Sequence, residues 1–182
     1  MQNPLSDPQT SKPDERLVGV WRLKNEDDSM VYYHAGHAGD KFPDSTLRVA
    51  FVRHEEGKVE SPGESWMFPT VLGEKSYLNA IDKKGQQDKP SEENGRNTTA
   101  VDSYYILKYQ VDGDRLLVWE MNADAKKQAI RDDQIKGVIE PNKPAKFTDT
   151  TENLARFVAE AGDGLFSKEP IRLERVDAGK KP

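Results

Sequence analysis

The histidines are the side chains whose type and spacing first point to chemistry in this 182-residue chain. His34 and His37 stand three residues apart in the segment HAGH, and Asp40 and Asp44 follow shortly after. Two imidazoles and a carboxylate form a ligand set that binds Zn²⁺ in catalytic sites. Two histidines on a Gly-rich loop are, however, usually just exposed polar residues. A metal-dependent enzyme that uses His34 and His37 is therefore one alternative function.

Other catalytic groups are scarce. The chain has no cysteine, which excludes thiolate nucleophiles, disulfides and cysteine-ligated metals. It contains no G-x-S-x-G elbow, P-loop or dinucleotide-binding glycine motif. Carboxylate doublets such as Asp27-Asp28 and Glu55-Glu56 are neighbours in polar turns, whereas acid–base pairs need separated carboxyls that flank a cleft. We therefore expect no catalytic residue, no bound metal, no cofactor and no enzymatic activity.

Aromatic side chains are the remaining candidates for a ligand-binding site. Tyr105 and Tyr109 share one face of an alternating segment with Leu107, which places two hydroxyls among apolar groups. A buried hydroxyl needs a partner, and water or the polar head of a ligand in an internal cavity would supply one. The predicted ligand-binding residues are these two tyrosines and four wall residues: Phe51, Trp66, Phe68 and Trp119. The rings equally suit a core that they fill solid, so this alternative stays open.

The bulk composition limits the class of protein. The length suits one domain, and the composition of 35% hydrophobic and 32% charged residues indicates a polar, well-solvated surface. A net charge of −5 argues against a nucleic-acid partner, because such a protein needs a dense positive face. No apolar run approaches the roughly 20 residues of a transmembrane helix, and no secretory signal opens the chain. We expect a monomer, cytoplasmic from the chain as given, or exported or membrane-tethered if an upstream signal was removed.

Short alternating runs dominate the first two thirds of the chain. Residues 1–14 carry three prolines and read as an extended polar leader outside the core, and 179–182 as a tail. Period-two alternation predicts strands over 16–24, 30–36 and 46–55, with a turn at Glu56-Gly57 before a further short strand. Two more strands are predicted within 65–82, broken near Pro69 or Gly73. The most polar stretch, 83–99, is predicted to be a long surface loop.

The later part of the chain contains the clearest local signals. The segment 103–121 predicts a hairpin around the turn Asp112-Gly113-Asp114. Two helices follow, over 122–137 and 148–162, before a last strand at 170–176. This order predicts a mainly β protein, an antiparallel barrel of roughly eight strands with two helices near the C-terminus, spanning residues 15–178 as a single domain.

The first strand carries a resemblance to a known family. Gly19-x-Trp21 behind a short leader, with a late helix and a last strand bearing arginines, resembles the lipocalins. The segments YLNA and TENLARF are similar to small uncharacterised bacterial lipocalin-like proteins, some of them lipoproteins. The resemblance implies that Trp21 plugs the closed end of the barrel, that Gly19 leaves space there, and that Arg175 or Arg172 lies across the indole. Arg175 is favoured because it shares its parity with two apolar residues of the last strand.

The leading functional hypothesis is therefore a non-catalytic binding protein for a small apolar or amphipathic ligand. A solid barrel that serves as a structural or interaction module of the cell envelope is the second hypothesis. The enzyme that uses the two histidines is the third.

Overall fold

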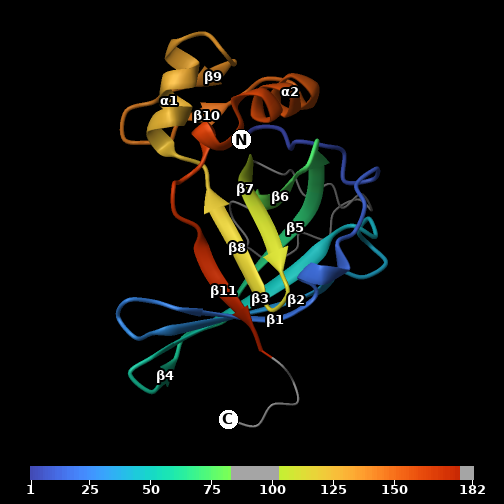
Figure 1. The fold of residues 1–182 in the computed structure, drawn as a ribbon, viewed down its shortest axis with the longest axis vertical. Coiled ribbons are helices and arrows are strands. Elements are labelled where there is room, and N and C mark those ends of the chain that lie inside the picture. The colour runs from blue at the N-terminus through green and yellow to red at the C-terminus, as the bar shows by residue number, and fades with distance from the viewer. Residues whose placement is uncertain (83–102, 177–182) are drawn as a thin grey trace, which may run out of the picture.

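Up to Glu120 the described elements are strands, apart from one short 3-10 helix, and two α-helices follow before the last strand (Figure 1). The structure is a computed structural model that describes residues 1–82 and 103–176. The loop predicted over 83–99 and the tail at 179–182 lie outside the described residues.

The elements follow one another in the order that the sequence predicts. The first half contains η1 (Glu15–Leu17), β1 (Gly19–Lys24), β2 (Met30–His37), β3 (Leu47–Glu55), β4 (Lys58–Val59), β5 (Gly63–Leu72) and β6 (Lys75–Asp82). The second half contains β7 (Ser103–Asp112), β8 (Arg115–Glu120), α1 (Ala123–Arg131), β9 (Gly137–Val138), β10 (Lys146–Phe147), α2 (Thr151–Ala161), η2 (Gly162–Leu165) and β11 (Ile171–Arg175).

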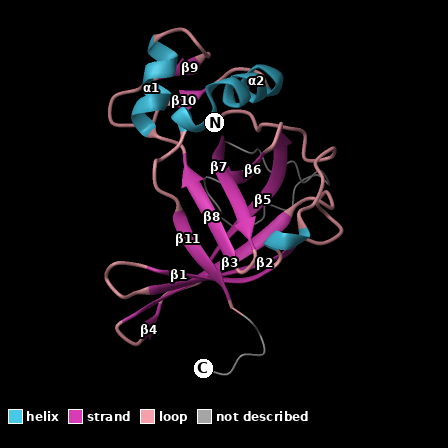
Figure 2. Cartoon of the chain, in the orientation of Figure 1, coloured by secondary structure: helices cyan, strands magenta, loops and turns pink. Residues whose placement is uncertain are grey.

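Eight of the described strands close into an antiparallel barrel. Their hydrogen-bonded order is β1-β2-β3-β5-β6-β7-β8-β11, and β11 returns to pair with β1 (Figure 2). The closing register places Trp21 opposite Arg175. Closure leaves no open edge along the barrel wall, which removes a template for aggregation. The predicted barrel is confirmed, while β4 only lengthens the hairpin that β3 begins.

The break between β5 and β6 lies at Gly73 and not at Pro69. Gly73 has a φ of 62° in the turn, a conformation that glycine adopts without strain. Pro69 lies within β5, although proline cannot donate to a strand ladder. The pairing of β3 with β5 ends at Met67, so from Phe68 onward β5 pairs only with β6. This part of β5 is therefore an edge toward β3, and edge strands are where sheets accommodate proline.

Both predicted helices are present and lie at one end of the barrel (Figure 2). Leu154 and Val158 of α2 are fully buried, as the predicted apolar face of this helix requires. They belong to an outer core between the helices and the outer face of the barrel, which also contains Tyr77, Ile106 and Phe147. No helix of the described ranges is long and apolar enough to cross a membrane.

The leader does not lie outside the core. Met1 and Leu5 are buried in the outer core, and the backbone N–H of Leu5 donates to Oδ1 of the buried Asn79 at 2.7 Å. The hydroxyl of Ser45 donates to the carbonyl of Pro8 at 2.8 Å. The prediction of a leader outside the core is wrong here, because two isolated apolar residues show no periodicity from which burial could be inferred.

Candidate functional site

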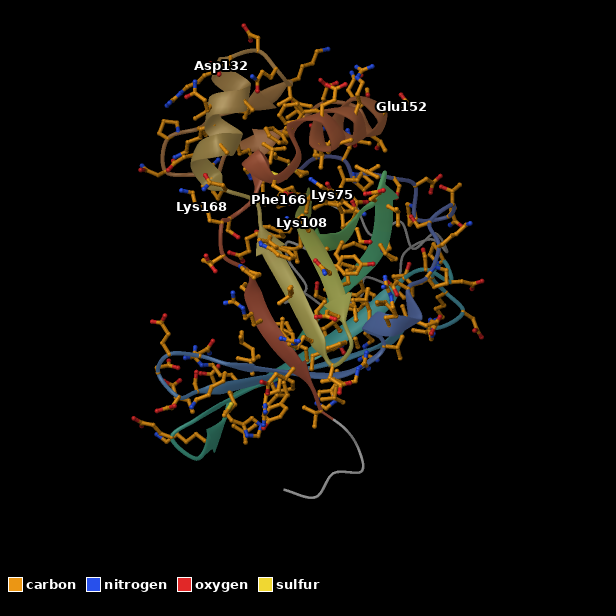
Figure 3. The ribbon with its side chains drawn as sticks, viewed as in Figure 1. Lys75, Lys108, Asp132, Glu152, Phe166 and Lys168 are labelled. Atoms are coloured by element: carbon orange, nitrogen blue, oxygen red, sulfur yellow. The ribbon has the colours of Figure 1, made fainter. Side chains whose placement is uncertain are left out.

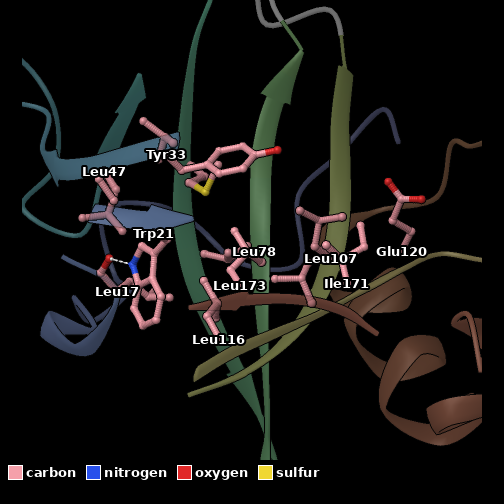
Figure 4. A pocket seen from close by; sticks show the side chains of 14 residues that line it. Leu17, Trp21, Tyr33, Leu47, Leu78, Leu107, Leu116, Glu120, Ile171 and Leu173 are labelled. Atoms are coloured by element: carbon pink, nitrogen blue, oxygen red, sulfur yellow. Dashed lines mark hydrogen bonds between the residues drawn. The ribbon is translucent and has the colours of Figure 1, made fainter. Parts of the chain in front are cut away.

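The barrel encloses an apolar cavity of about 210 Å³ (Figure 4). Residues of one parity on each strand point inward, as the pleat of a strand requires. Twelve of the fourteen lining residues are apolar: Leu17, Trp21, Ala35, Leu47, Val49, Met67, Leu78, Leu107, Leu116, Val118, Ile171 and Leu173. The other two are Tyr33 and Glu120. The lumen is therefore an apolar chamber with a small number of polar groups, the usual form of a small-molecule site.

Trp21 closes one end of this chamber. It is almost fully buried, and its indole N–H donates to the carbonyl of Leu17 at 2.8 Å. The guanidinium carbon of Arg175 lies 4.2 Å from the centre of the indole ring, the geometry of a cation–π contact. Arg175 also donates to the carbonyls of Val18 (2.8 Å) and Arg16. Arg175, and not Arg172, thus covers the tryptophan.

Gly19 is required at the same end of the barrel. Its φ is 137°, which side chains disfavour, and a Cβ at this position would lie 2.6 Å from Nη1 of Arg175. The glycine two residues before the tryptophan therefore makes room for the arginine that covers the ring. The arrangement of Gly19, Trp21 and Arg175 is the one that the resemblance implied.

The two polar lining residues are Tyr33, which is in register with Trp21 on the neighbouring strand, and Glu120, which lies away from Trp21. Figure 4 draws the Tyr33 ring across the lumen, with its hydroxyl directed toward the side on which Glu120 lies. Burial raises the pKa of Tyr33, and the negative charge of Glu120 raises it further. Tyr33 is half-buried, and Glu120 is an exposed residue at the last position of β8. The side of the cavity where Glu120 lies is therefore polar and reaches solvent.

The two tyrosines predicted to bind a ligand occupy different environments. Tyr109 is buried in the inner cluster, but its hydroxyl donates to Oδ2 of Asp14 at 2.8 Å. Burial, and then this hydrogen bond, raise the pKa of Tyr109. Tyr105 shares the parity of Leu107 but is 60% exposed. The prediction that lumen water or a ligand must satisfy both hydroxyls is wrong, because a protein carboxylate satisfies one and solvent reaches the other residue.

Three of the four predicted wall residues lie on the outer face of the barrel. Trp66 is in register with Arg48, and its ring stacks on Phe42 at 6.3 Å. Phe68 contacts the ring of Tyr104 edge-on at 6.3 Å. The prediction that these two rings line the lumen is wrong, because the outer face is itself covered by chain.

Trp119 also packs outside the barrel, against the outer core. The ammonium of Lys108 lies 4.1 Å from the centre of its ring and also pairs with Asp163 at 2.9 Å. Figure 3 shows Lys108, Lys75 and Phe166 where the barrel meets the helices. The residues of β8 that face the lumen are Leu116, Val118 and Glu120. The prediction that Trp119 lines the lumen is therefore wrong, because the alternate residues of β8 face inward.

Phe51 is the remaining predicted wall residue. It has the parity of Leu47 and Val49, and its ring centre lies 6.1 Å from that of Tyr33. It is 38% exposed and packs against Gly63 of β5, but it is not among the residues that line the cavity. It therefore lies beside the cavity, on the Tyr33 side.

The sequence contained a partial signal for the lining residues that were missed. Tyr33 alternates with Val31 and Ala35 in an apolar segment, so its inward direction follows from strand parity alone. Glu120 had no such signal, because β8 is apolar on both faces and a charged residue at its end reads as a solvated terminus. The interior parity of β8 becomes evident only from its register with β7, where Leu107 lies opposite Glu120.

The paired histidines do not form a metal centre. The HAGH segment is the end of strand β2, so His34 and His37 point to opposite faces of the sheet. Nε2 of His37 lies 3.2 Å from Oε2 of Glu15. Within residues 1–82 and 103–176, no group of three or more histidine, aspartate or glutamate side chains is arranged to hold a metal ion. The loop geometry that the zinc hypothesis needed is absent from this segment.

Comparisons of the chain with models of protein families, with curated proteins and with solved structures find no match. The geometry of the barrel and its lumen is therefore the basis for any functional assignment.

Proposed function

We propose that this protein is a non-catalytic, lipocalin-like carrier that binds a small amphipathic molecule in the barrel lumen. The observation that carries the proposal is the apolar cavity of about 210 Å³, in which the Tyr33 hydroxyl is directed toward the side where Glu120 lies, away from the tryptophan plug. An apolar tail would lie among the leucines and valines, and a polar head would lie near Tyr33 and Glu120.

The size of the cavity supports a small ligand. An apolar cavity of about 150 Å³ in another protein accepts benzene, whereas drug-sized ligands occupy pockets of about 300 Å³ or more. The lumen lies between these limits. Each methylene buried contributes about 0.8 kcal/mol, and association costs several kcal/mol, so short-chain amphiphiles should bind with Kd between about 1 μM and 1 mM.

The closed end supports the family part of the proposal. Gly19, Trp21 and Arg175 form an interdependent set, in which the glycine makes room for the guanidinium and the guanidinium covers the indole. Such a plug leaves the opposite end as the entrance. In a barrel that serves only as a structural module, the apolar side chains would be expected to fill the interior, whereas here twelve of them surround a cavity.

Calorimetric titration with 1-octanol, a neutral amphiphile, tests the proposal. Val118 lines the cavity and Val71 is 66% exposed on the surface, so the same enlargement can be made at both positions. We expect Val118→Phe to fill part of the lumen and weaken octanol binding at least about tenfold, and Val71→Phe to leave it unchanged. Thermal unfolding of both variants checks that each still folds. If octanol does not bind the unaltered protein, or if Val118→Phe binds it equally well, the lumen is not the site.

A further inference from the structure

We infer that the lumen selects amphiphiles with a cationic head, such as an alkylamine, and that Glu120 is the residue that makes the selection. The inference rests on the proposed function and deepens it, because it names the chemical class of the ligand that the chamber accepts.

Glu120 is the single charged residue among the fourteen that line the cavity. Among the described residues, no cationic nitrogen lies within 4 Å of its carboxylate, and no side chain donates a hydrogen bond to it. Because Glu120 is exposed at the open end of the chamber, its carboxylate is solvated and has no ion-pair partner within the described protein. An incoming ammonium would provide both the charge and the hydrogen-bond donors.

The cations near the lumen wall do not line the cavity: Lys168 follows Ser167, whose N–H donates to the carbonyl of Glu120, and three others have ion-pair partners of their own. Arg53, on β3 two residues beyond Phe51, pairs with Asp27 at 2.9 Å. Arg172, next to Ile171 on β11, pairs with Glu169 at 3.3 Å. Lys108 lies on the outer face of β7 and is held by Asp163 and Trp119. The charge that faces the lumen is therefore negative, which favours a positive head and repels a carboxylate head.

Tyr33 complements Glu120 for an ammonium ion. Its hydroxyl extends into the lumen and accepts no hydrogen bond from another described residue, and its aromatic ring offers a face to a cation (Figure 4). A primary ammonium has three donors, so it can bind the carboxylate and the phenol oxygen together. The two residues come from strands far apart in the barrel order, β2 and β8, so the head would be held from two sides.

The test compares octylamine, 1-octanol and octanoate, which share an apolar tail and differ in the charge of the head. At about pH 7, where the amine is protonated and the acid ionised, we expect calorimetry to rank octylamine about tenfold tighter than 1-octanol and octanoate weakest. Glu120→Gln should lower octylamine affinity about tenfold, to the level of octanol, and leave octanol binding unchanged. Glu120→Lys should reverse the preference toward octanoate.

A matched control removes one negative charge away from the lumen. Glu152 is exposed on α2 and does not line the cavity (Figure 3), so Glu152→Gln should preserve the ranking of the three ligands. If octanol and octylamine bind equally well, or if Glu120→Gln keeps the amine preference, the inference fails while the proposed carrier function stands. If none of the three ligands binds, both fail.

Discussion

The barrel wall separates two cores that differ in composition and in filling. The outer core, between the wall and the helices, contains the rings of Tyr77, Phe147 and Phe166 together with the fully buried Leu154 of α2. The inner core is mainly aliphatic and keeps a cavity of about 210 Å³. Eight strands leave an interior that side chains can fill or that can hold one small ligand. Here more of the aromatic rings pack outside than inside, and the mainly aliphatic lining leaves space within.

This difference indicates that the two faces of one sheet contribute differently to the stability of the fold. Burial of large side chains against a second layer stabilises the fold, because close packing maximises both apolar burial and dispersion contacts. An interior that is left partly hollow gives up some of that stabilisation. Such a loss is expected where a site must accept a ligand, and it makes the comparison of the two cores open to direct measurement.

The largest expected effect comes from truncating one leucine in each core. Leu154→Ala removes a side chain that is 0% exposed and should destabilise the protein by about 3–5 kcal/mol. Leu107→Ala removes a half-buried side chain that already borders the cavity, so its cost should be at least about 1 kcal/mol smaller. Urea unfolding of the two variants measures both values. Equal losses would show that the inner core is packed as tightly as the outer one.

A smaller effect is expected at the closed end of the lumen, where the inner core is tight. Gly19→Ala places a Cβ 2.6 Å from the Arg175 guanidinium at a φ of 137°, and should cost about 1–3 kcal/mol. Gly36→Ala is the control, because a Cβ there meets no atom within 4 Å. The free energies of unfolding should separate the two variants. A harmless Gly19→Ala would mean that Arg175 moves away from Trp21 without cost.

The smallest effect concerns the inner-core hydroxyl of Tyr109. Its pKa is raised in the folded protein, so folding holds its proton while the unfolded chain releases it above about pH 10. The contribution is fully present below that pH and is lost as the pH rises, at roughly 1 kcal/mol per pH unit. Tyr109→Phe should make the alkaline decline shallower in a pH series of urea unfolding curves.

Part of that decline should persist in Tyr109→Phe. Burial also raises the pKa of Tyr33, Tyr77 and Tyr104, and these three residues remain in the variant. An alkaline decline that is identical in the two proteins would mean that the Tyr109 hydroxyl is not held by Asp14 in solution.

The sequence by itself determined most of the strands and both α-helices of this protein. Strand alternation and turn glycines are local signals, so the hairpin at 103–121, the turn at Gly113 and the late helices followed from short segments alone. The plug at one end was implied by the resemblance that Gly19-x-Trp21 carries, and the structure places Arg175 over Trp21 with the space that Gly19 leaves.

The tertiary structure alone decided which face of each strand is inside. Both faces of β5 and β8 are apolar, because one face lines the lumen and the other meets helices or loops. The residue types alone therefore did not indicate that Trp66, Phe68 and Trp119 lie on the outer face. The same holds for Glu120, which reads as a solvated strand end until its register with Leu107 directs it to the cavity. Strand alternation shows that neighbouring side chains point to opposite faces, but which face lies inside the barrel follows only from the register and the packing of the whole sheet.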